Sequence, residues 1–343
     1  MVIHEIIDPY NLTISVLITL AWQAMGFAIA WTFKFDKITD FTGGSNFFIL
    51  ALITLTTGGT YYARNIVASL LTMLWAARLA GFLLFRVLKT GSDARFDDIR
   101  THFFKFAAFW TGQILWVWVV ALPVVILNSA AVSDVRRGGA NPSFGTACDI
   151  IGIILFTIGF LWESIGDVQK YLFKVGNPPK GQPCTKGLWK FSRHPPYFGE
   201  IVLHWGLWIF CLSPTAYGNV STGTRRAQYA AITSPIFTIL LLFFLSGLPT
   251  AEKPSAKKYY LMSHDPSPNR GVPPKAKNDH WRNYKAYLAR TSVVLPIPPQ
   301  VYKPIPEWVK RTILLDFPMF RFDEAIDGRE ALEAESQKRA GDV

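Results

Sequence analysis

The sequence predicts an all-α polytopic membrane protein with about seven transmembrane helices and a polar tail on the cytosolic side. Half of the 343 residues are apolar, and the mean hydropathy is +0.22. Long apolar runs with few charges recur along the chain, most of them close to the ~20 residues that cross a bilayer core. Cations gather in alternate gaps between these runs, as expected when cytosolic loops carry the positive charge.

Seven candidate spans follow one another along the chain. The first begins after the acidic residues Glu5 and Asp8 rather than after a basic leader, so we expect a retained span and not a cleaved signal. The sixth is too short to cross a bilayer unless residues 197–200 continue it. The expected spans are residues 12–33, 47–62, 66–87, 104–127, 150–165, 201–212 and 229–248.

The distribution of charge predicts the orientation of the chain. The first, third and fifth gaps hold most of the lysine and arginine residues, so we expect the N-terminus outside and the C-terminus in the cytosol. The sequons at Asn11 and Asn219 both fall on the expected outer side. The net charge of +11 is interpreted as orientation and membrane-surface charge, and no nucleic-acid partner is expected. If the source is eukaryotic, the endoplasmic reticulum is the expected membrane.

The order of the spans and the change in composition along the chain predict three regions. Residues 1–66 form the first two spans, residues 67–300 form a core with spans three to seven and the cytosolic loops, and residues 301–343 form a polar tail. The three cysteines, Cys148, Cys184 and Cys211, show no metal-ligand spacing and no disulfide framework. No metal site is therefore expected.

Charged side chains follow a helical period at the end of the fifth span. Glu163, Asp167, Lys170 and Lys174 are separated by four, three and four positions, so they fall on one face of a helix that continues the span. One interpretation is an exposed ion-pair stripe above the bilayer. The other is a polar face that grips a hydrophilic ligand, because acidic groups near lipid are costly unless they face protein or water.

The segment KFSRHPPYFGE, residues 190–200, comes directly before the sixth span. Pro195 and Pro196 end the preceding loop, and Pro196 suits the first turn of a helix. Tyr197 and Glu200 then share one face of that turn. Arg193 and His194 carry donors suited to a phosphate group.

With the preceding KGLWKF, this segment resembles the RHPNYFGE-type signature of the steroid 5-alpha reductase family and its less characterised membrane relatives. The resemblance extends over roughly residues 70 to 300 and includes WRNYKAYLARTSVVLPIPP. It implies a membrane reductase that uses NADPH to saturate the carbon–carbon double bond of an electron-poor, enone-type lipophilic substrate, such as a steroid or sterol. Pro196 stands where the family has Asn, and Glu163 also stands at an Asn position.

The resemblance implies a set of site residues. The catalytic candidates are Tyr62, Tyr197 and Glu200. The candidates for binding the cofactor are Glu163, Asp167, Lys170, Lys174, Arg193, His194, Tyr197, Glu200, His280, Tyr284 and Arg290.

A second class of enzyme shares this signature. Isoprenylcysteine carboxyl methyltransferases and phospholipid methyltransferases carry an RHPxYxG motif before a late span, bind S-adenosylmethionine, and usually place a pair of glutamates after the last span. The corresponding segment here, LPTAEKPSAKKYY, holds Glu252 alone. A non-catalytic membrane scaffold is a third alternative. The bilayer and, for the enzyme classes, a lipophilic small molecule are the expected partners; the oligomeric state is left open.

Overall fold

The computed structural model describes residues 8–90, 99, 101–179, 181–265 and 277–341. The described residues form helices joined by turns and loops, with an isolated bridge between Ser192 and Ser292. The chain forms two compact units: residues 1–157 and 202–238 make unit 1, and residues 158–201 and 239–343 make unit 2. Six described helical segments are long and apolar enough to cross a membrane, so the predicted class, an all-α polytopic membrane protein, is confirmed.

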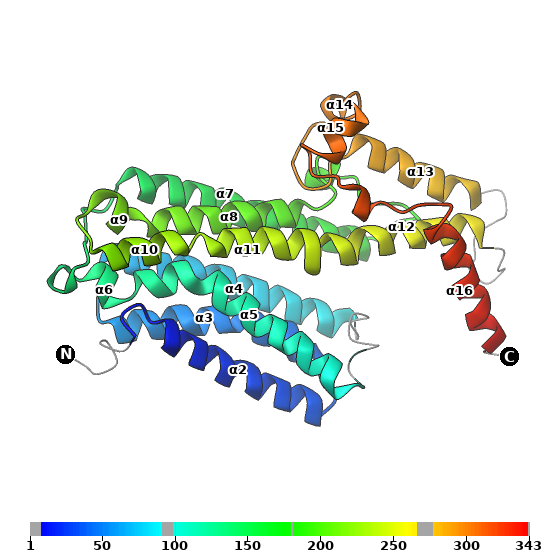
Figure 1. The fold of residues 1–343 in the computed structure, drawn as a ribbon. Helices are drawn as coiled ribbons and strands as arrows, with labels where there is room; N and C mark the ends of the chain where they lie inside the picture. Colours follow the sequence, from blue (N-terminus) through cyan, green and yellow to red (C-terminus); the bar gives the residue numbers. More distant parts are fainter. Residues whose placement is uncertain (1–7, 91–98, 100, 180, 266–276, 342–343) are drawn as a thin grey trace. The chain divides into compact units, whose positions relative to one another are not determined.

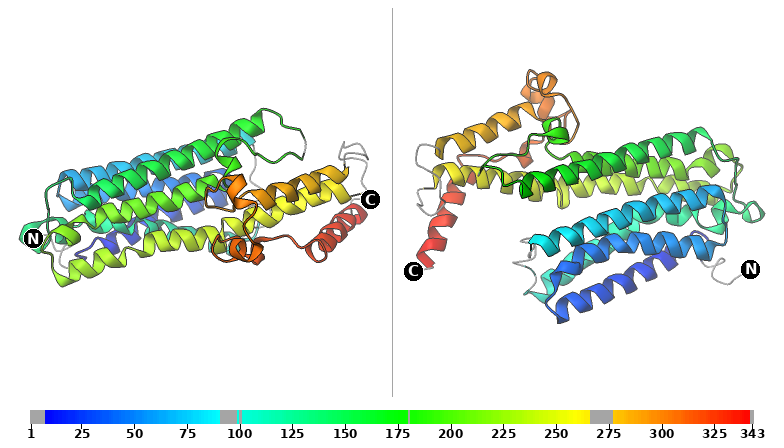
Figure 2. Two further views of the ribbon diagram at one scale, coloured as in Figure 1. Left: turned by 90° about the horizontal axis from the view of Figure 1, so that it is seen from above. Right: turned by 180° about the vertical axis from the view of Figure 1, so that it is seen from behind.

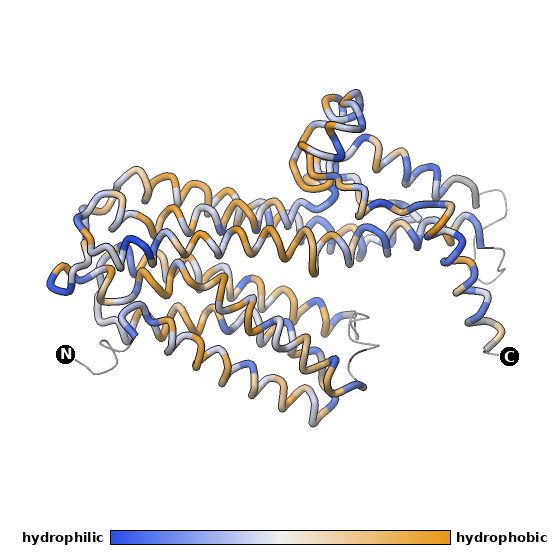
Figure 3. The backbone as a smooth tube through the Cα atoms, in the orientation of Figure 1, coloured by the Kyte–Doolittle hydropathy of each residue, from blue (hydrophilic) through white to orange (hydrophobic). Residues whose placement is uncertain are grey.

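Unit 1 is built on four long helices that lie side by side (Figures 1 and 2). Their colouring in Figure 3 is mainly hydrophobic. Shorter elements belong to the same unit. The long helices are α2 (Leu12–Thr32), α3 (Thr39–Gly58), α4 (Ala63–Thr90) and α5 (Phe103–Leu127); the short elements are η1 (Asp36–Ile38), α6 (Ala130–Ser133), η3 (Val135–Arg137), α9 (Ser213–Tyr217) and α10 (Thr222–Ala230).

Helix α3 begins eight residues before the expected second span, because its first two turns are polar and nevertheless buried. Thr39, Thr42 and Asn46 lie inside unit 1. Neighbouring helices bind some of their polar atoms: Gln113 Nε2 donates to the Thr39 carbonyl at 3.0 Å, and Gln23 Nε2 donates to Asn46 Oδ1 at 3.1 Å. Hydropathy alone does not predict such polar residues within a span. They can be buried there because neighbouring helices form hydrogen bonds with them.

A buried ion pair joins α4 to the first turn of α7 (Ala147–Val175). Arg64 Nε lies 2.8 Å from Asp149 Oδ1, and both side chains are at most 2% exposed. The guanidinium also donates to Asn141 Oδ1 and to the carbonyls of Pro142 and Ser143. A charge pair that is buried this deeply is tolerated because nearly every donor is satisfied.

Helix α8 (Pro195–Cys211) settles the length of the sixth expected span. Residues 197–200 do continue it, and its 17 residues make a helix of roughly 25 Å, at the lower end of what spans a bilayer core. Within unit 2 it packs closely on α7, because a Cβ on Gly199 would lie only 2.6 Å from the Glu163 amide nitrogen. Glycine at position 199 therefore lets the two backbones approach.

The last apolar stretch, residues 222–264, is helical but interrupted. After α10 come α11 (Thr233–Leu240), a π-helical turn η5 (Leu241–Leu245), and α12 (Leu248–His264). A Cβ on Gly247 would lie 2.2 Å from the Leu242 carbonyl oxygen, so only glycine fits at the start of α12. π-Helical turns are often found next to functional sites, and α12 carries Glu252.

Unit 2 continues well beyond α12. Helix α13 (Lys277–Arg290) lies along α12, and the aromatic rings of Tyr260, Trp281, Tyr284 and Tyr287 pack between them. Both α13 and α16 are largely hydrophilic in Figure 3. The remaining elements are η4 (Gly187–Lys190), α14 (Pro299–Tyr302), α15 (Glu307–Arg311), η7 (Pro318–Phe320) and α16 (Asp327–Gly341).

The expected boundary at residue 300 does not coincide with a boundary between the units. Residues 301–341 belong to unit 2, where Tyr302 and Phe320 are almost completely buried. Phe320 joins Leu248 and Val293 in one apolar cluster. Part of the expected polar tail is therefore a folded segment of the unit that carries the candidate site.

Candidate functional site

The loop that carries Arg193 and His194 is held by a segment a hundred residues further along the chain. The Arg193 amide donates to the Ser292 carbonyl at 2.8 Å, and the His194 amide donates to the Val293 carbonyl at 3.1 Å. The Ile297 amide donates to the Phe191 carbonyl at 3.1 Å. These bonds join the two stretches whose sequences carry the resemblance, KFSRHPPYFGE and SVVLPIPP.

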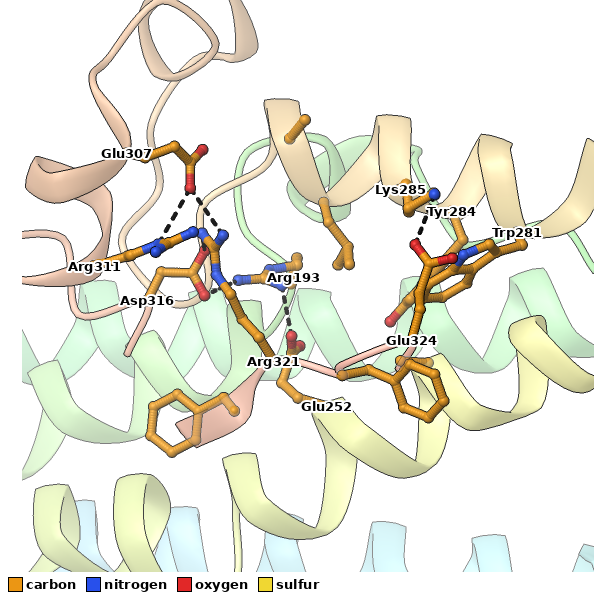
Figure 4. Close-up of a pocket in the computed structure, with 15 residues that line it drawn as sticks. Arg193, Glu252, Trp281, Tyr284, Lys285, Glu307, Arg311, Asp316, Arg321 and Glu324 are labelled. Atoms are coloured by element: carbon orange, nitrogen blue, oxygen red, sulfur yellow. Dashed lines mark hydrogen bonds and ion pairs between the residues drawn. The ribbon is translucent and has the colours of Figure 1, made fainter. Parts of the chain in front are cut away.

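Arg193 is buried between two carboxylates (Figure 4). Its Nη1 lies 2.5 Å from Glu252 Oε2, and its Nη2 lies 2.7 Å from Asp316 Oδ1. Burial alone would lower the pKa of the guanidinium, but the charges of Glu252 and Asp316 more than offset this and raise the pKa above its ordinary value. Arg193 is therefore a permanent cation between two acidic residues.

His194 binds the second oxygen of Glu252. The distance from His194 Nε2 to Glu252 Oε1 is 2.6 Å, and the imidazole stacks on the ring of Tyr197 with centroids 4.9 Å apart. The carboxylate at the start of α12 thus contacts both basic residues of the SRHPP segment. This geometry differs from the expected binding of a phosphate by Arg193 and His194, because both side chains already have a carboxylate partner.

A cavity of about 240 Å³ opens beside this cluster. Tyr259 and Tyr284 stack in it with ring centroids 4.2 Å apart, and the Lys170 ammonium lies 4.1 Å from the centre of the Trp189 ring. Burial raises the pKa of the Tyr284 phenol and of the Tyr287 phenol, so both stay protonated and neutral. The lining is Lys170, Pro183, Cys184, Trp189, Arg193, His194, Ala251, Glu252, Ser255, Tyr259, Tyr284 and Tyr287.

A second cavity, of about 310 Å³, is also lined by Arg193, Glu252 and Tyr284. Its charged groups are largely paired with one another, as Figure 4 shows. Arg321 lies 2.8 Å from Glu307 and 3.0 Å from Asp316, and Lys285 lies 2.8 Å from Glu324. Residues beyond position 300 supply much of its lining, and none of those was expected at the site.

The predicted polar face of α7 lies largely on the buried side of this helix. Glu163 is 2% exposed, Asp167 and Lys170 are half-buried, and Lys174 is exposed. The positions between them, such as Ile165 and Val168, are apolar and exposed, as expected for side chains that face lipid. This half-buried pattern favours a polar face turned toward protein over a fully solvated ion-pair stripe.

Pro196 has a packing role in the structure. A Cβ on Gly166 of α7 would lie 3.1 Å from Pro196 Cδ, so the ring rests against the backbone of α7. Trp189 Nε1 donates to the Gly166 carbonyl at 2.9 Å and braces the same place. An apolar ring at position 196 therefore serves the contact between α7 and the start of α8.

The structure does not place all of the candidate residues around the first cavity. Tyr62 belongs to unit 1, in the turn before α4, and Arg64 beside it pairs with Asp149 at the start of α7. His280 packs against Gly181. Arg290 lines a separate cavity with Lys190. Tyr197 and Glu200 lie in the first two turns of α8. The catalytic roles of Tyr62, Tyr197 and Glu200 stay predictions.

Several lining residues escaped the sequence reasoning. Trp189, Tyr259 and Tyr287 belong to no recognisable sequence motif. The signal for two of them is the number of aromatic residues in the sequence around positions 259 and 287. Asp316 lies in a segment expected to be a polar tail. Its partner Arg193 is more than a hundred positions away, and no spacing rule connects the two.

The fold and the site define a polytopic membrane protein with a carboxylate-bound Arg-His motif beside an aromatic cavity in unit 2. Residues 26–264 match DUF1295, a family described as a protein of unknown function. Because this match covers well over half of the chain, the protein belongs to the DUF1295 family.

One curated relative carries a name that suggests a chemistry. The chain is 35% identical over 83 residues to a probable O-methyltransferase named ustE, from Ustilaginoidea virens. The aligned stretch is 23% of this chain and 27% of the relative, so the chain spans about a quarter of that protein. No solved structure matches the chain.

Proposed function

We propose that the protein is a membrane-embedded methyltransferase that uses S-adenosylmethionine to methylate an oxygen atom of a lipophilic acceptor. The observation that carries this proposal is the contact of Glu252 with both Arg193 and His194. Membrane methyltransferases with the RHPxYxG motif usually place a pair of glutamates after the last span. Here the single glutamate of that segment, Glu252, contacts the Arg193 and His194 side chains of the motif.

The cavity suits a sulfonium cofactor. S-Adenosylmethionine carries a positive charge on sulfur, and cations are attracted to aromatic faces and to carboxylates. Trp189, Tyr259 and Tyr284 offer aromatic rings, and Glu252 offers a carboxylate at the same place. Arg193 and His194 are bound to carboxylates, which leaves Lys170 of this cavity to contact the phosphates of a dinucleotide.

When bound, the cofactor supplies a methyl group that leaves its sulfur for the acceptor oxygen. The protein's own contribution is to hold charges and exclude water. Glu252 is held by Arg193 and His194 of the loop before α8, and the phenols of Tyr284 and Tyr287 stay neutral. Such preorganised groups need no reorganisation when a charged ligand reacts.

The acceptor is expected to reach the site from the membrane. Six candidate spans place the chain in a bilayer, and Ile165 and Val168 expose apolar side chains on α7 beside the polar face. We propose that the N-terminus lies outside and the C-terminus in the cytosol, in the endoplasmic reticulum of a eukaryotic cell, because that orientation follows from the cation distribution.

Ligand-dependent melting of the detergent-solubilised protein tests the proposal. S-Adenosylhomocysteine, the demethylated product, should raise the melting temperature in a concentration-dependent way, because a ligand that binds only the folded state stabilises it. Tyr259→Leu removes a stacked ring of the cavity and keeps the Arg193–Glu252 pair. It should raise the dissociation constant of S-adenosylhomocysteine roughly tenfold, which corresponds to a loss of about 1.4 kcal/mol of binding free energy.

Two further variants separate the cofactor classes. Glu252→Gln should abolish binding of S-adenosylhomocysteine, whereas Glu324→Gln makes the same chemical change at an exposed ion pair and should leave binding unchanged. Lys170→Met removes an ammonium that would hold a phosphate, and it should leave binding of S-adenosylhomocysteine largely intact. Stabilisation by NADPH but not by S-adenosylhomocysteine would instead support the reductase. No stabilisation by either would support a scaffold.

A further inference from the structure

We propose that Asp316 is a positioning residue of the site: it holds Arg193 at the terminal nitrogen that Glu252 does not contact and offsets part of the Arg193 charge, so that Glu252 attracts a cationic ligand more strongly. The inference rests on the proposed function. It assigns a role to a segment outside residues 26–264, which are the residues that match the family.

Asp316 is built into the protein and is not a chance surface contact. Its side chain is 3% exposed, and its Oδ1 lies 2.7 Å from Arg193 Nη2. Its Oδ2 accepts from the Tyr302 hydroxyl at 3.2 Å and from Arg321 Nη2 at 3.0 Å. Its own amide donates to the Lys310 carbonyl at 2.9 Å. Both carboxylate oxygens and the backbone are therefore fixed.

The segment around Asp316 is itself anchored to the rest of unit 2. Lys310 is buried, and its ammonium donates to the Ala289 carbonyl at the end of α13 and to the Lys303 carbonyl, both at 3.3 Å. Phe320 packs in the apolar cluster with Phe243 and Val293. Asp316 lies four residues before Phe320, in this anchored segment. It can therefore hold the Arg193 guanidinium in place.

The geometry at Arg193 requires two partners. A guanidinium is a rigid planar fork. Glu252 accepts a hydrogen bond from one of its terminal nitrogens and Asp316 pairs with the other, so the two carboxylates restrict its position. With Glu252 alone, Arg193 could swing together with that carboxylate into the cavity that both residues line.

The charge balance leads to the same role. Arg193 and His194 together approach Glu252, so without Asp316 the carboxylate would be compensated by all of the charge on Arg193. Asp316 shares that charge, while its second oxygen pairs with Arg321, which is in turn held by Glu307. Glu252 thereby keeps more of its negative potential for a sulfonium at the aromatic cavity.

The test compares Asp316→Asn with Asp327→Asn in the full-length protein. Both substitutions are isosteric, but Asp327 forms a more exposed ion pair with Lys253. We expect Asp316→Asn to weaken binding of S-adenosylhomocysteine roughly ten- to a hundredfold, because the buried ion pair with the Arg193 guanidinium is lost. Asp327→Asn should change it less than twofold, and Asp316→Glu should restore part of the affinity. Equal affinity in the two Asn variants would overturn the proposal.

A second measurement does not depend on the cofactor. Hydrogen exchange of the amides at 191–194 should accelerate in Asp316→Asn and stay unchanged in Asp327→Asn. If the wild type binds no S-adenosylhomocysteine, the proposed function fails, and this exchange alone decides the role of Asp316: faster exchange at 191–194 supports it, and unchanged exchange overturns it. Should Asp316→Asn not fold, Tyr302→Phe removes one bond to its Oδ2; a few-fold loss of affinity or faster exchange at 191–194 is then expected, and no change in both contradicts the proposal.

Discussion

At the scale of single residues, Glu252 shows how a charged group gains a defined role through its neighbours. The motif residues Arg193 and His194 could be predicted as site residues from the sequence, and the structure does place them on one cavity with Tyr284. Their partners could not be predicted in the same way. A carboxylate that neutralises a cation from over fifty positions away leaves no local pattern, so the sequence suggested phosphate binding where the structure has ion pairs.

Arg64 provides a second prediction at this scale. Its guanidinium is buried and bound to Asp149 and to three further acceptors in unit 1. Arg64→Gln leaves the Asp149 charge buried without its partner, so we expect it to destabilise the protein by about 3–5 kcal/mol. Thermal melting in detergent measures this loss. The control, Arg226→Gln, changes an exposed arginine and should shift stability by less than about 0.5 kcal/mol; equal melting of the two variants would contradict the structural role of the pair.

At the scale of elements, the spans could be predicted from the length of the apolar runs, and the polar face of α7 from its helical period. The start of α3 could not, because Thr39 to Asn46 are buried by hydrogen bonding that hydropathy does not register. The fold of residues 299–326 was also missed. These residues have little apolar periodicity, and their burial depends on contacts with α12, α13 and the 190–194 loop.

The close approach of α7 and α8 gives the prediction at this scale. Gly199→Ala would place a methyl group 2.6 Å from backbone atoms at Gly159 and Glu163, which cannot move aside as a flexible side chain would. We expect it to destabilise the protein by about 1–3 kcal/mol through overpacking. The melting temperature should fall. The shape of the cavity beside Arg193 should also change, which should weaken the binding of S-adenosylhomocysteine.

Gly112→Ala, in helix α5, is the matched control for Gly199→Ala. A Cβ at position 112 of α5 meets no atom within 4 Å. Alanine also has the higher helix propensity, by up to about 1 kcal/mol. The melting temperature should therefore stay the same or rise. A fall as large as that of Gly199→Ala would show that helix contacts are not what distinguishes the two glycines.

At the scale of the whole molecule, the orientation in the membrane remains a prediction that the structure makes easier to test. Asn219 is exposed, whereas Asn11 is buried and its amide donates to the Val125 carbonyl at 3.4 Å. When the protein is made in the presence of endoplasmic reticulum membranes, Asn219 should be glycosylated and Asn11 should not. Asn219→Gln should remove the mass shift, and Asn11→Gln should leave it. A shift that persists in Asn219→Gln, or none in the wild type, would argue against this orientation.

The Arg193 cluster can form only late in synthesis. It depends on the bonds between the 190–194 loop and residues 292–297 and on the contact with Asp316. Chains fold from the N-terminus as they leave the ribosome, and contacts between distant residues form last. When residue 264 has emerged, every candidate span and Glu252 are present, but the partners of Arg193 at positions 292 and 316 are not. The polypeptide is thus inserted in the membrane before its site can close, and a premature stop after codon 264 and at or before codon 316 would leave a membrane-inserted protein with an incomplete Arg193 cluster.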